Sequence, residues 1–260
     1  ENISRFSRED LSTFVHEHYS PDRMILSAAG GIDHDALCKL AEKAFGDLQK
    51  PKLSHQSRAA VFSGGEFRKD KKLEQAHFAL AFESPSYRSL DIYTAQVYSI
   101  ALGGGMSSRL FQQIREKRGL CYSIFAQAGA FSDTGLTTIY AGTSAEQIPD
   151  LANLTVNELK RAAIDLSESE VTRARSQMKA GLLMGLESPS SRAERLARMI
   201  QIWGKVPSLD ETIEKIDSVN LEKVRAYAEH VVSQAKFAMA LYGPISSAPS
   251  LQELDALRAA

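Results

Sequence analysis

Three consecutive glycines, Gly103 to Gly105, follow an apolar segment and limit what the surrounding chain can fold into. Glycine loses more conformational freedom on folding than other residues, so such a run is unfavourable inside a helix or a strand. The missing side chain also lets the backbone approach another group closely. We therefore expect a break in secondary structure here, with the glycines acting as a close-approach loop or a hinge.

The residues after the glycines have the pattern of a helix followed by a strand. Ser107 and Ser108 are typical N-cap residues, and Gly119 stands where a left-handed residue would end the helix. The interval predicts about three helical turns, with Arg115 near their end. Because the chain then continues as a strand that begins near Tyr122, the cation and the phenol can face one place.

The stretch GGGMSSRLFQQIREKRGLCYS, residues 103–123, closely resembles the second-half signature of the pitrilysin-type zinc metallopeptidases, peptidase family M16. This family includes the mitochondrial processing peptidases, of subfamily M16B, and their bacterial relatives. In the family, an arginine and a tyrosine seven residues later lie on the second domain, face the zinc site of the first domain and help to hold the peptide. The resemblance therefore implies substrate-binding roles for Arg115 and Tyr122, and two similar domains arranged as a clamshell.

Two similar local patterns indicate an internal repeat. A gapless alignment that places Phe6 on Val219 superposes a helix cap, an apolar helix face, an apolar run of strand length and a glycine. The run in the first copy is Met24 to Ala29, and Gly30 falls on Gly243. Agreement of all these features indicates a duplicated unit.

The repeat suggests how the chain is divided. We expect residues 1–48 to be the C-terminal part of a first M16 domain, 49–66 to be a polar linker, and 67–260 to be a complete second domain of the inactive type. A strand at Met24 to Ala29 would need sheet partners, and in this interpretation they are encoded upstream of Glu1.

The second domain combines strands of alternating apolar residues with longer amphipathic helices. Strands are expected at 67–70, 74–82, 121–131 and 136–142, and helices at 91–102, 147–163, 167–188, 191–203 and 210–216, before the repeated unit from Asn220. Ser167 with Glu170, like Ser7 with Asp10 near the start of the chain, predicts a capping box at a helix N-terminus. This order predicts the α+β class, with an antiparallel sheet and helices packed on one face. The resemblance implies the metallohydrolase-type fold of the M16 family, shared with the mitochondrial processing peptidases.

The zinc motif of the family, HxxEH, is absent. That motif places two histidines and a general-base glutamate on one helix face. His16 and His18 are only two positions apart, so on a helix their rings point about 200° apart and cannot share an ion. We therefore expect no metal site in this chain, although the resemblance implies zinc in the intact enzyme.

Plainer interpretations of the singled-out residues stay open. Arg115 could be a solvated cation near a helix C-terminus, and Tyr122 a half-buried strand aromatic. The glycines lack the Lys-Ser/Thr of a P-loop. Arg109, Lys117 and Arg118 would form a basic patch in a nucleic-acid-binding protein, but no array of stacking aromatics accompanies them.

Composition excludes several function classes. The 260 residues carry a net charge of −1, which gives no general attraction to nucleic acid or anionic membranes. Two cysteines, Cys38 and Cys121, show no disulfide or zinc pattern. No run approaches the roughly 18 apolar residues of a membrane helix. A bacterial protein of this kind would be cytoplasmic, and a eukaryotic one would lie in the mitochondrial matrix.

The leading hypothesis is the C-terminal portion of a zinc-dependent M16 endopeptidase that cleaves peptides or presequences. It would bind an unfolded polypeptide through Arg115 and Tyr122, would be inactive alone because HxxEH is absent, and would need an N-terminal zinc-binding half or a partner subunit in a homo- or heterodimer. The alternatives are a non-catalytic companion subunit or core-type scaffold, and a free-standing peptide-binding module.

Overall fold

The computed structural model describes residues 3–49 and 58–260, which form two compact units. One unit consists of Glu1–Ala59 and Met184–Val206, and the other of Ala60–Leu183 and Pro207–Ala260. We call them the smaller and the larger unit. The sequence did not predict that Met184–Val206 groups with the N-terminal residues. Part of the expected linker, residues 50–57, lies outside the described residues, and the domain boundaries inferred from sequence stay a prediction.

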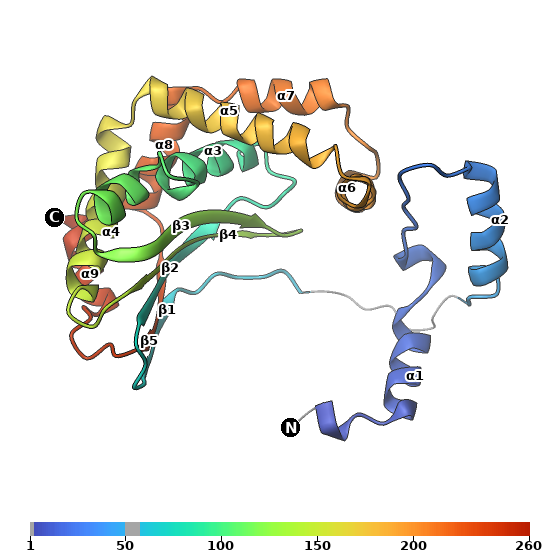
Figure 1. The fold of residues 1–260 in the computed structure, drawn as a ribbon, viewed down its shortest axis with the longest axis horizontal. Helices are drawn as coiled ribbons and strands as arrows, with labels where there is room; N and C mark the ends of the chain where they lie inside the picture. The colour runs from blue at the N-terminus through green and yellow to red at the C-terminus, as the bar shows by residue number, and fades with distance from the viewer. Residues whose placement is uncertain (1–2, 50–57) are drawn as a thin grey trace. The chain divides into compact units, whose positions relative to one another are not determined.

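The larger unit contains one sheet of five strands in the order β1-β5-β2-β4-β3 (Figure 1). Its strands are β1 (Gly65–Asp70), β2 (Ala76–Ser84), β3 (Cys121–Ala130), β4 (Gly135–Thr143) and β5 (Phe237–Gly243). All neighbouring strands are antiparallel except β1 and β5, which run parallel. The sheet is therefore mixed, and the expectation of a purely antiparallel sheet is wrong. The long helical connection before β5 lets that strand enter between β1 and β2 in either direction, which strand patterns alone do not fix.

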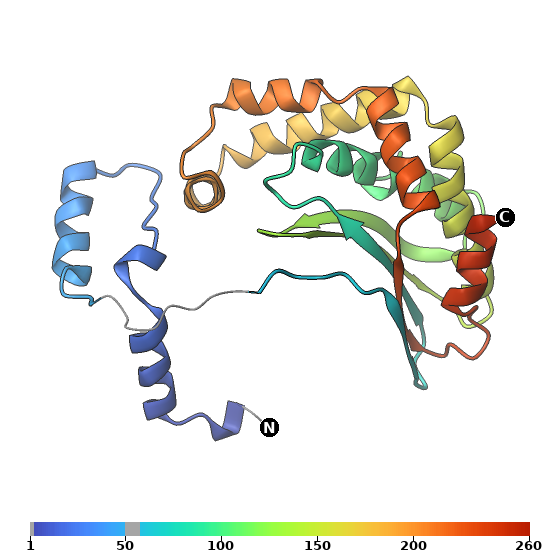
Figure 2. The same cartoon turned by 180° about the vertical axis from the view of Figure 1, so that it is seen from behind.

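Helices cover one face of this sheet (Figures 1 and 2). They are α3 (Ile92–Gly103), α4 (Ile148–Asp165), α5 (Glu168–Gly185), α7 (Leu209–Asp217), α8 (Leu221–Ser233) and α9 (Leu251–Ala259). Phe78, Leu80 and Phe82 of β2 are fully buried toward the helices, while the residues between them are only half-buried. This alternation is what the sequence predicted, and the α+β class is confirmed. None of the helices in the described ranges is long and apolar enough to cross a membrane.

The smaller unit contains α1 (Arg8–His18), α2 (His34–Phe45), α6 (Pro189–Trp203) and the 3-10 turns η1 (Ile3–Arg5) and η2 (Pro21–Arg23). The expected capping box is present, because the Ser7 hydroxyl accepts from the backbone of Asp10 and the Asp10 carboxylate accepts from the backbone of Ser7.

The expected strand at Met24–Ala29 does not form. Met24 has extended backbone angles, φ −116° and ψ 140°, but no described segment supplies a hydrogen-bonded ladder for this run. Instead, the Ser27 hydroxyl donates to the carbonyl of Ala193 in α6 at 2.7 Å. A strand is defined by its pairing as well as by its residues, so apolar composition alone was insufficient here.

Candidate functional site

The first residue of the glycine run brings the end of α3 against the strand β3. A Cβ atom on Gly103, the last residue of α3, would lie 2.4 Å from the backbone nitrogen of Ala126 in β3. Helix and strand can therefore touch only because the side chain is missing. The Gln177 side-chain amide of α5 donates to the carbonyl of Gly104 at 2.7 Å. Of the three glycines, Gly103 alone makes a close backbone approach to another element, and the role of Gly103 to Gly105 as a hinge or close-approach loop stays a prediction.

After the glycines the chain forms a π-helical turn, η3 (Phe111–Glu116), where the sequence predicted ordinary α-helix. The amide of Lys117 donates to the carbonyl of Gln112, five residues back, at 3.1 Å. Such turns contain one residue more than an α turn and occur often at functional sites. The predicted stop is confirmed, because Gly119 has a left-handed φ of +63° and its amide donates to the carbonyl of Arg115.

Tyr122 lies in a β-bulge at the start of β3. Cys121 pairs with Thr143 and Ser123 with Gly142, so Tyr122 is the extra residue without a partner position. A bulge turns a side chain out of the regular pleat and is common beside active sites. The Tyr122 side chain is accordingly 79% exposed. The three-residue spacing between buried Cys121 and Ile124 breaks the strand period, and this signal could have predicted the bulge.

The structure brings Arg115 and Tyr122 together. The guanidinium carbon of Arg115 lies 5.0 Å from the centre of the Tyr122 ring and 4.6 Å from the centre of the Phe111 ring. Its ion pair with Glu116 is long, at 3.9 Å, and a third of the Arg115 side chain is exposed. The cation is therefore held mainly by aromatic rings. Sequence reasoning missed Phe111, although its position four residues before Arg115 on a helical turn was a signal.

This arrangement can bind oxygen acceptors. The two ring contacts do not occupy the N–H donors of the guanidinium, so a carboxylate or a peptide carbonyl can accept hydrogen bonds from them. The exposed phenol of Tyr122 can donate or accept one more hydrogen bond. Lys117 and Arg118 follow directly in the chain and add positive charge, beside the acidic Glu116 and with Asp150 lining the same hollow as Arg118. Together these groups can hold an extended peptide but supply no metal-activated nucleophile.

Zinc does not fit the residues that the structure describes. Within residues 3–49 and 58–260, no three His, Cys, Asp or Glu side chains come together as a metal site. His16 is engaged through Nδ1 with the carbonyl of Ser12 at 2.7 Å, and the ring of His18 packs against that of Phe14. We derive no step through a metal held by these side chains.

Arg109 is a buried anchor of the site and not part of a basic patch. Its side chain is only 9% exposed and donates to both oxygens of Glu170 in α5 and to Asp165 at the end of α4. Burial alone would raise the pKa of the Glu170 carboxyl, but the hydrogen bonds from Arg109 and Ser167 outweigh it and hold that pKa below its usual value. Arg109, two residues before η3, is thus bonded to two helices.

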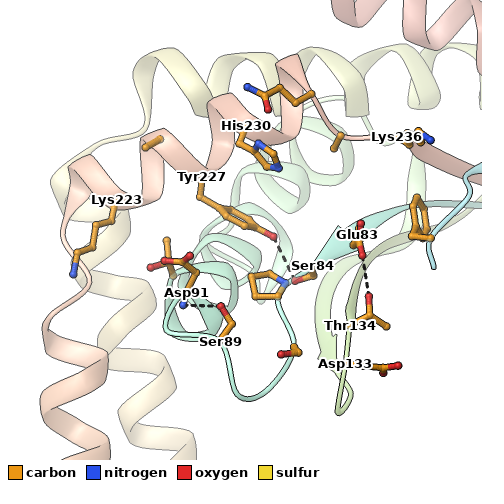
Figure 3. A pocket seen from close by; sticks show the side chains of 17 residues that line it. Glu83, Ser84, Ser89, Asp91, Asp133, Thr134, Lys223, Tyr227, His230 and Lys236 are labelled. Atoms are coloured by element: carbon orange, nitrogen blue, oxygen red, sulfur yellow. Dashed lines mark hydrogen bonds between the residues drawn. The ribbon is translucent and has the colours of Figure 1, made fainter. Parts of the chain in front are cut away.

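A pocket of about 920 Å³ lies at the other end of the sheet (Figure 3). Tyr227 and His230 of α8 form one wall, and the Tyr227 hydroxyl points at Ser84 of β2, 3.4 Å away. On the opposite side the Thr134 hydroxyl donates to Glu83 at 3.1 Å. Eight residue steps along β2, roughly 26 Å, separate this end from the start of β3. The described lining includes none of the predicted site residues.

With the geometry in hand, comparison with known proteins decides the family. The protein family described as "Peptidase M16 inactive domain" matches residues 5–178 of this chain. The chain belongs to the peptidase M16 family. The resemblance first seen in residues 103–123 is thereby confirmed. Among M16 relatives, the "Uncharacterized zinc protease YmxG" of Bacillus subtilis (strain 168) is 35% identical over 253 residues, which is 96% of this chain and 61% of the relative.

A second M16 relative is the "Uncharacterized zinc protease Mb2805c" of Mycobacterium bovis, 34% identical over 264 residues, which is 99% of this chain and 60% of that protein. The chain thus spans about three fifths of the length of these relatives. A chain of the solved structure "Complex III2 from Candida albicans, Inz-5 bound" superposes with a TM-score of 0.86 at 23% identity, covering 98% of this chain and 63% of that one. This last likeness supports the fold alone.

Proposed function

We propose that this chain is the C-terminal portion of a zinc-dependent M16 endopeptidase that cleaves peptides or presequences, and that it binds the substrate through Arg115 and Tyr122. The observation that carries the proposal is the stack of the Arg115 guanidinium on the exposed Tyr122 ring, at 5.0 Å. Zinc and its ligands would belong to another part of the protein or to a partner subunit. The names of the relatives, which call them zinc proteases, support this assignment.

Exposed apolar side chains in the smaller unit support the need for such a partner. Leu11 and Phe14 of α1 are 55% and 54% exposed, and Leu40 of α2 is 64% exposed, although all lie on apolar helix faces. Such side chains normally pack against further protein. The family's inactive-domain description likewise implies a partner domain or subunit. We assign that cover to a zinc-binding half or a second subunit, in a homo- or heterodimer.

The test uses the full-length protein and a fluorogenic, unstructured peptide. The wild-type protein should cleave the peptide, and a zinc chelator should abolish cleavage. R115A should lower kcat/KM about 100- to 1,000-fold if Arg115 donates to the substrate in the transition state, because the loss of one such positioned donor has an effect of that size. Y122F keeps the ring and should have a smaller effect. K117A, which removes a neighbouring cation, and Y242F, which alters another exposed tyrosine of the sheet, are the matched controls and should be close to wild type.

Two outcomes would refute the assignment. Equal losses in R115A and K117A would mean that general positive charge, and not the stacked pair, matters. Failure of the full-length protein to cleave any peptide with its zinc site intact would favour the second candidate, a non-catalytic companion or scaffold. The observation that favours this second candidate is that the described residues contain no metal-binding group. A cytoplasmic location in a bacterium completes the proposal, and cell fractionation checks it.

A further inference from the structure

We propose that Phe111 is a positioning residue for Arg115, and that the turn η3 exists in this form to stack the two side chains against Tyr122. The inference rests on the proposed substrate-binding role of Arg115. It goes beyond that role by assigning to a third residue the task of fixing the direction in which the cation donates.

The anchoring of η3 determines where Phe111 and Arg115 lie. Leu110 and Ile114 are fully buried and fix the inner side of the turn in the core. Phe111 and Arg115 each follow one of these anchors, so they lie next to each other on the adjoining side of the turn. Phe111 is itself half-buried, which limits its rotation. The π-helical turn therefore presents a fixed ring with a cation beside it.

Two aromatic rings lie close to the guanidinium. Its carbon is 4.6 Å from the Phe111 centroid and 5.0 Å from the Tyr122 centroid, both within the range of cation–π attraction. Tyr122 is largely exposed, so by itself it would hold the cation weakly. Phe111 supplies the rigid side of the stack. With both contacts present, less conformational freedom remains to be lost when a peptide binds.

The stack also limits what Arg115 can recognise. The N–H donors of a guanidinium lie in its plane, and contacts with two rings limit how that plane can turn. The acceptors that fit are planar oxygen groups approaching edge-on, namely a backbone carbonyl of an extended peptide or a carboxylate. Phe111 thereby favours the binding of a peptide in one orientation and makes binding by undirected charge attraction less important.

Two substitutions separate positioning from simple packing. F111L keeps an apolar side chain of similar size but has no aromatic face, whereas F111Y keeps the aromatic face. In side-chain NMR spectra of the protein, the Arg115 resonances should lose the part of their ring-current shift that comes from Phe111 in F111L and keep it in F111Y, while the part from Tyr122 stays in both. In peptide titrations of the full-length protein, F111L should weaken binding about two- to fivefold, the range of one exposed cation–π contact. F111Y should bind the peptide about as tightly as the wild type.

A double substitution supplies the decisive control. In an R115Q background, F111L should produce no further loss of affinity, because the ring would have no cation to position. The inference is overturned if F111L leaves the Arg115 resonances unchanged, or if it weakens binding equally with and without Arg115. Wild-type protein that binds no peptide would instead overturn the proposed function, while the NMR shifts alone still decide whether Phe111 holds Arg115.

Discussion

Gly103 sits at the junction of α3 and β3, where its missing side chain sets the distance between the two elements. A Cβ atom there would also lie 2.7 Å from the Cβ of Ala126, nearer than atoms of this kind pack. Because the obstructing atoms belong to a strand of the central sheet, neither neighbour can move away cheaply. Gly105 differs, since its added Cβ would meet only the end of the Gln177 side chain, at 3.2 Å.

These two glycines give a matched prediction. G103A should lower the free energy of unfolding by about 1–3 kcal/mol, because overpacking against β3 outweighs the gain in helix propensity. G105A should change it by less than about 0.5 kcal/mol, because Gln177 can shift. Urea denaturation followed by circular dichroism measures both. Equal stability of G103A and wild type would show that the helix end is not in close contact with the strand.

At the scale of elements, a buried cation connects three pieces of secondary structure. Arg109 precedes η3 and bonds to Asp165 at the end of α4 and to Glu170 in the first turn of α5. Glu170 also completes the predicted capping box, accepting from the backbone of Ser167 at 2.8 Å. The turn that carries Arg115 is thus fixed at its start by Arg109 and at its end by Gly119.

Replacing this cation should change both stability and its pH dependence. R109M should lower the free energy of unfolding at pH 7 by about 1–3 kcal/mol, since it leaves the partly buried Glu170 unpaired while the more exposed Asp165 contributes little. Desolvation would raise the pKa values of Asp165 and Glu170, but hydrogen bonds from Arg109, together with Arg161 at Asp165 and Ser167 at Glu170, lower them in the folded protein. Their contribution is therefore complete above the unfolded pKa values, near 4, and is lost as the pH falls through the folded ones.

The difference between wild type and R109M should consequently narrow as the pH is lowered from 7 to 3. Denaturant titrations at several pH values check this. K215M removes the exposed Lys215–Glu211 pair, 3.6 Å long, and should cost less than about 0.5 kcal/mol at any pH. A gap between wild type and R109M that does not depend on pH would contradict an ionic role for Arg109.

At the scale of the whole chain, the two units differ sharply in what they bury. The larger unit has a continuous core from β2 through α3, α4 and α8. The described helices α1 and α2 of the smaller unit contain no buried residue. Without a core, a helix is held mainly by its own hydrogen bonds, which break and re-form easily.

Hydrogen exchange should report this difference directly. In the 260-residue chain, amides of α1 and α2 should exchange at least about 100-fold faster than those of α3 and α4, since local opening there disrupts few apolar contacts. Addition of the partner domain or subunit should slow the exchange of α1 and α2 and leave α3 unchanged. Equal protection of all four helices in the isolated chain would show that the smaller unit is stable by itself.

Much of the fold and part of the site follow from local sequence. The capping box at Ser7 and Asp10, the stop at Gly119 and the alternation of β2 were all predicted, because each depends on residues within one or two turns or along one strand. The family was recognisable from the segment between Gly103 and Tyr122 for the same reason. Within this segment the glycines, the helix cap, the helix stop and the start of the strand follow one another closely.

Other features were decided only by the tertiary structure. They are the parallel pairing of β1 with β5, the missing strand at Met24–Ala29 and the ion pairs of Arg109. Each depends on whether a partner far away in the chain is available, and no local pattern shows that. The sequence by itself determined that Arg115 and Tyr122 could meet. Only packing determined how they do: buried anchors fix the turn η3, a bulge turns Tyr122 outward, and Phe111 adds a second ring contact to the cation.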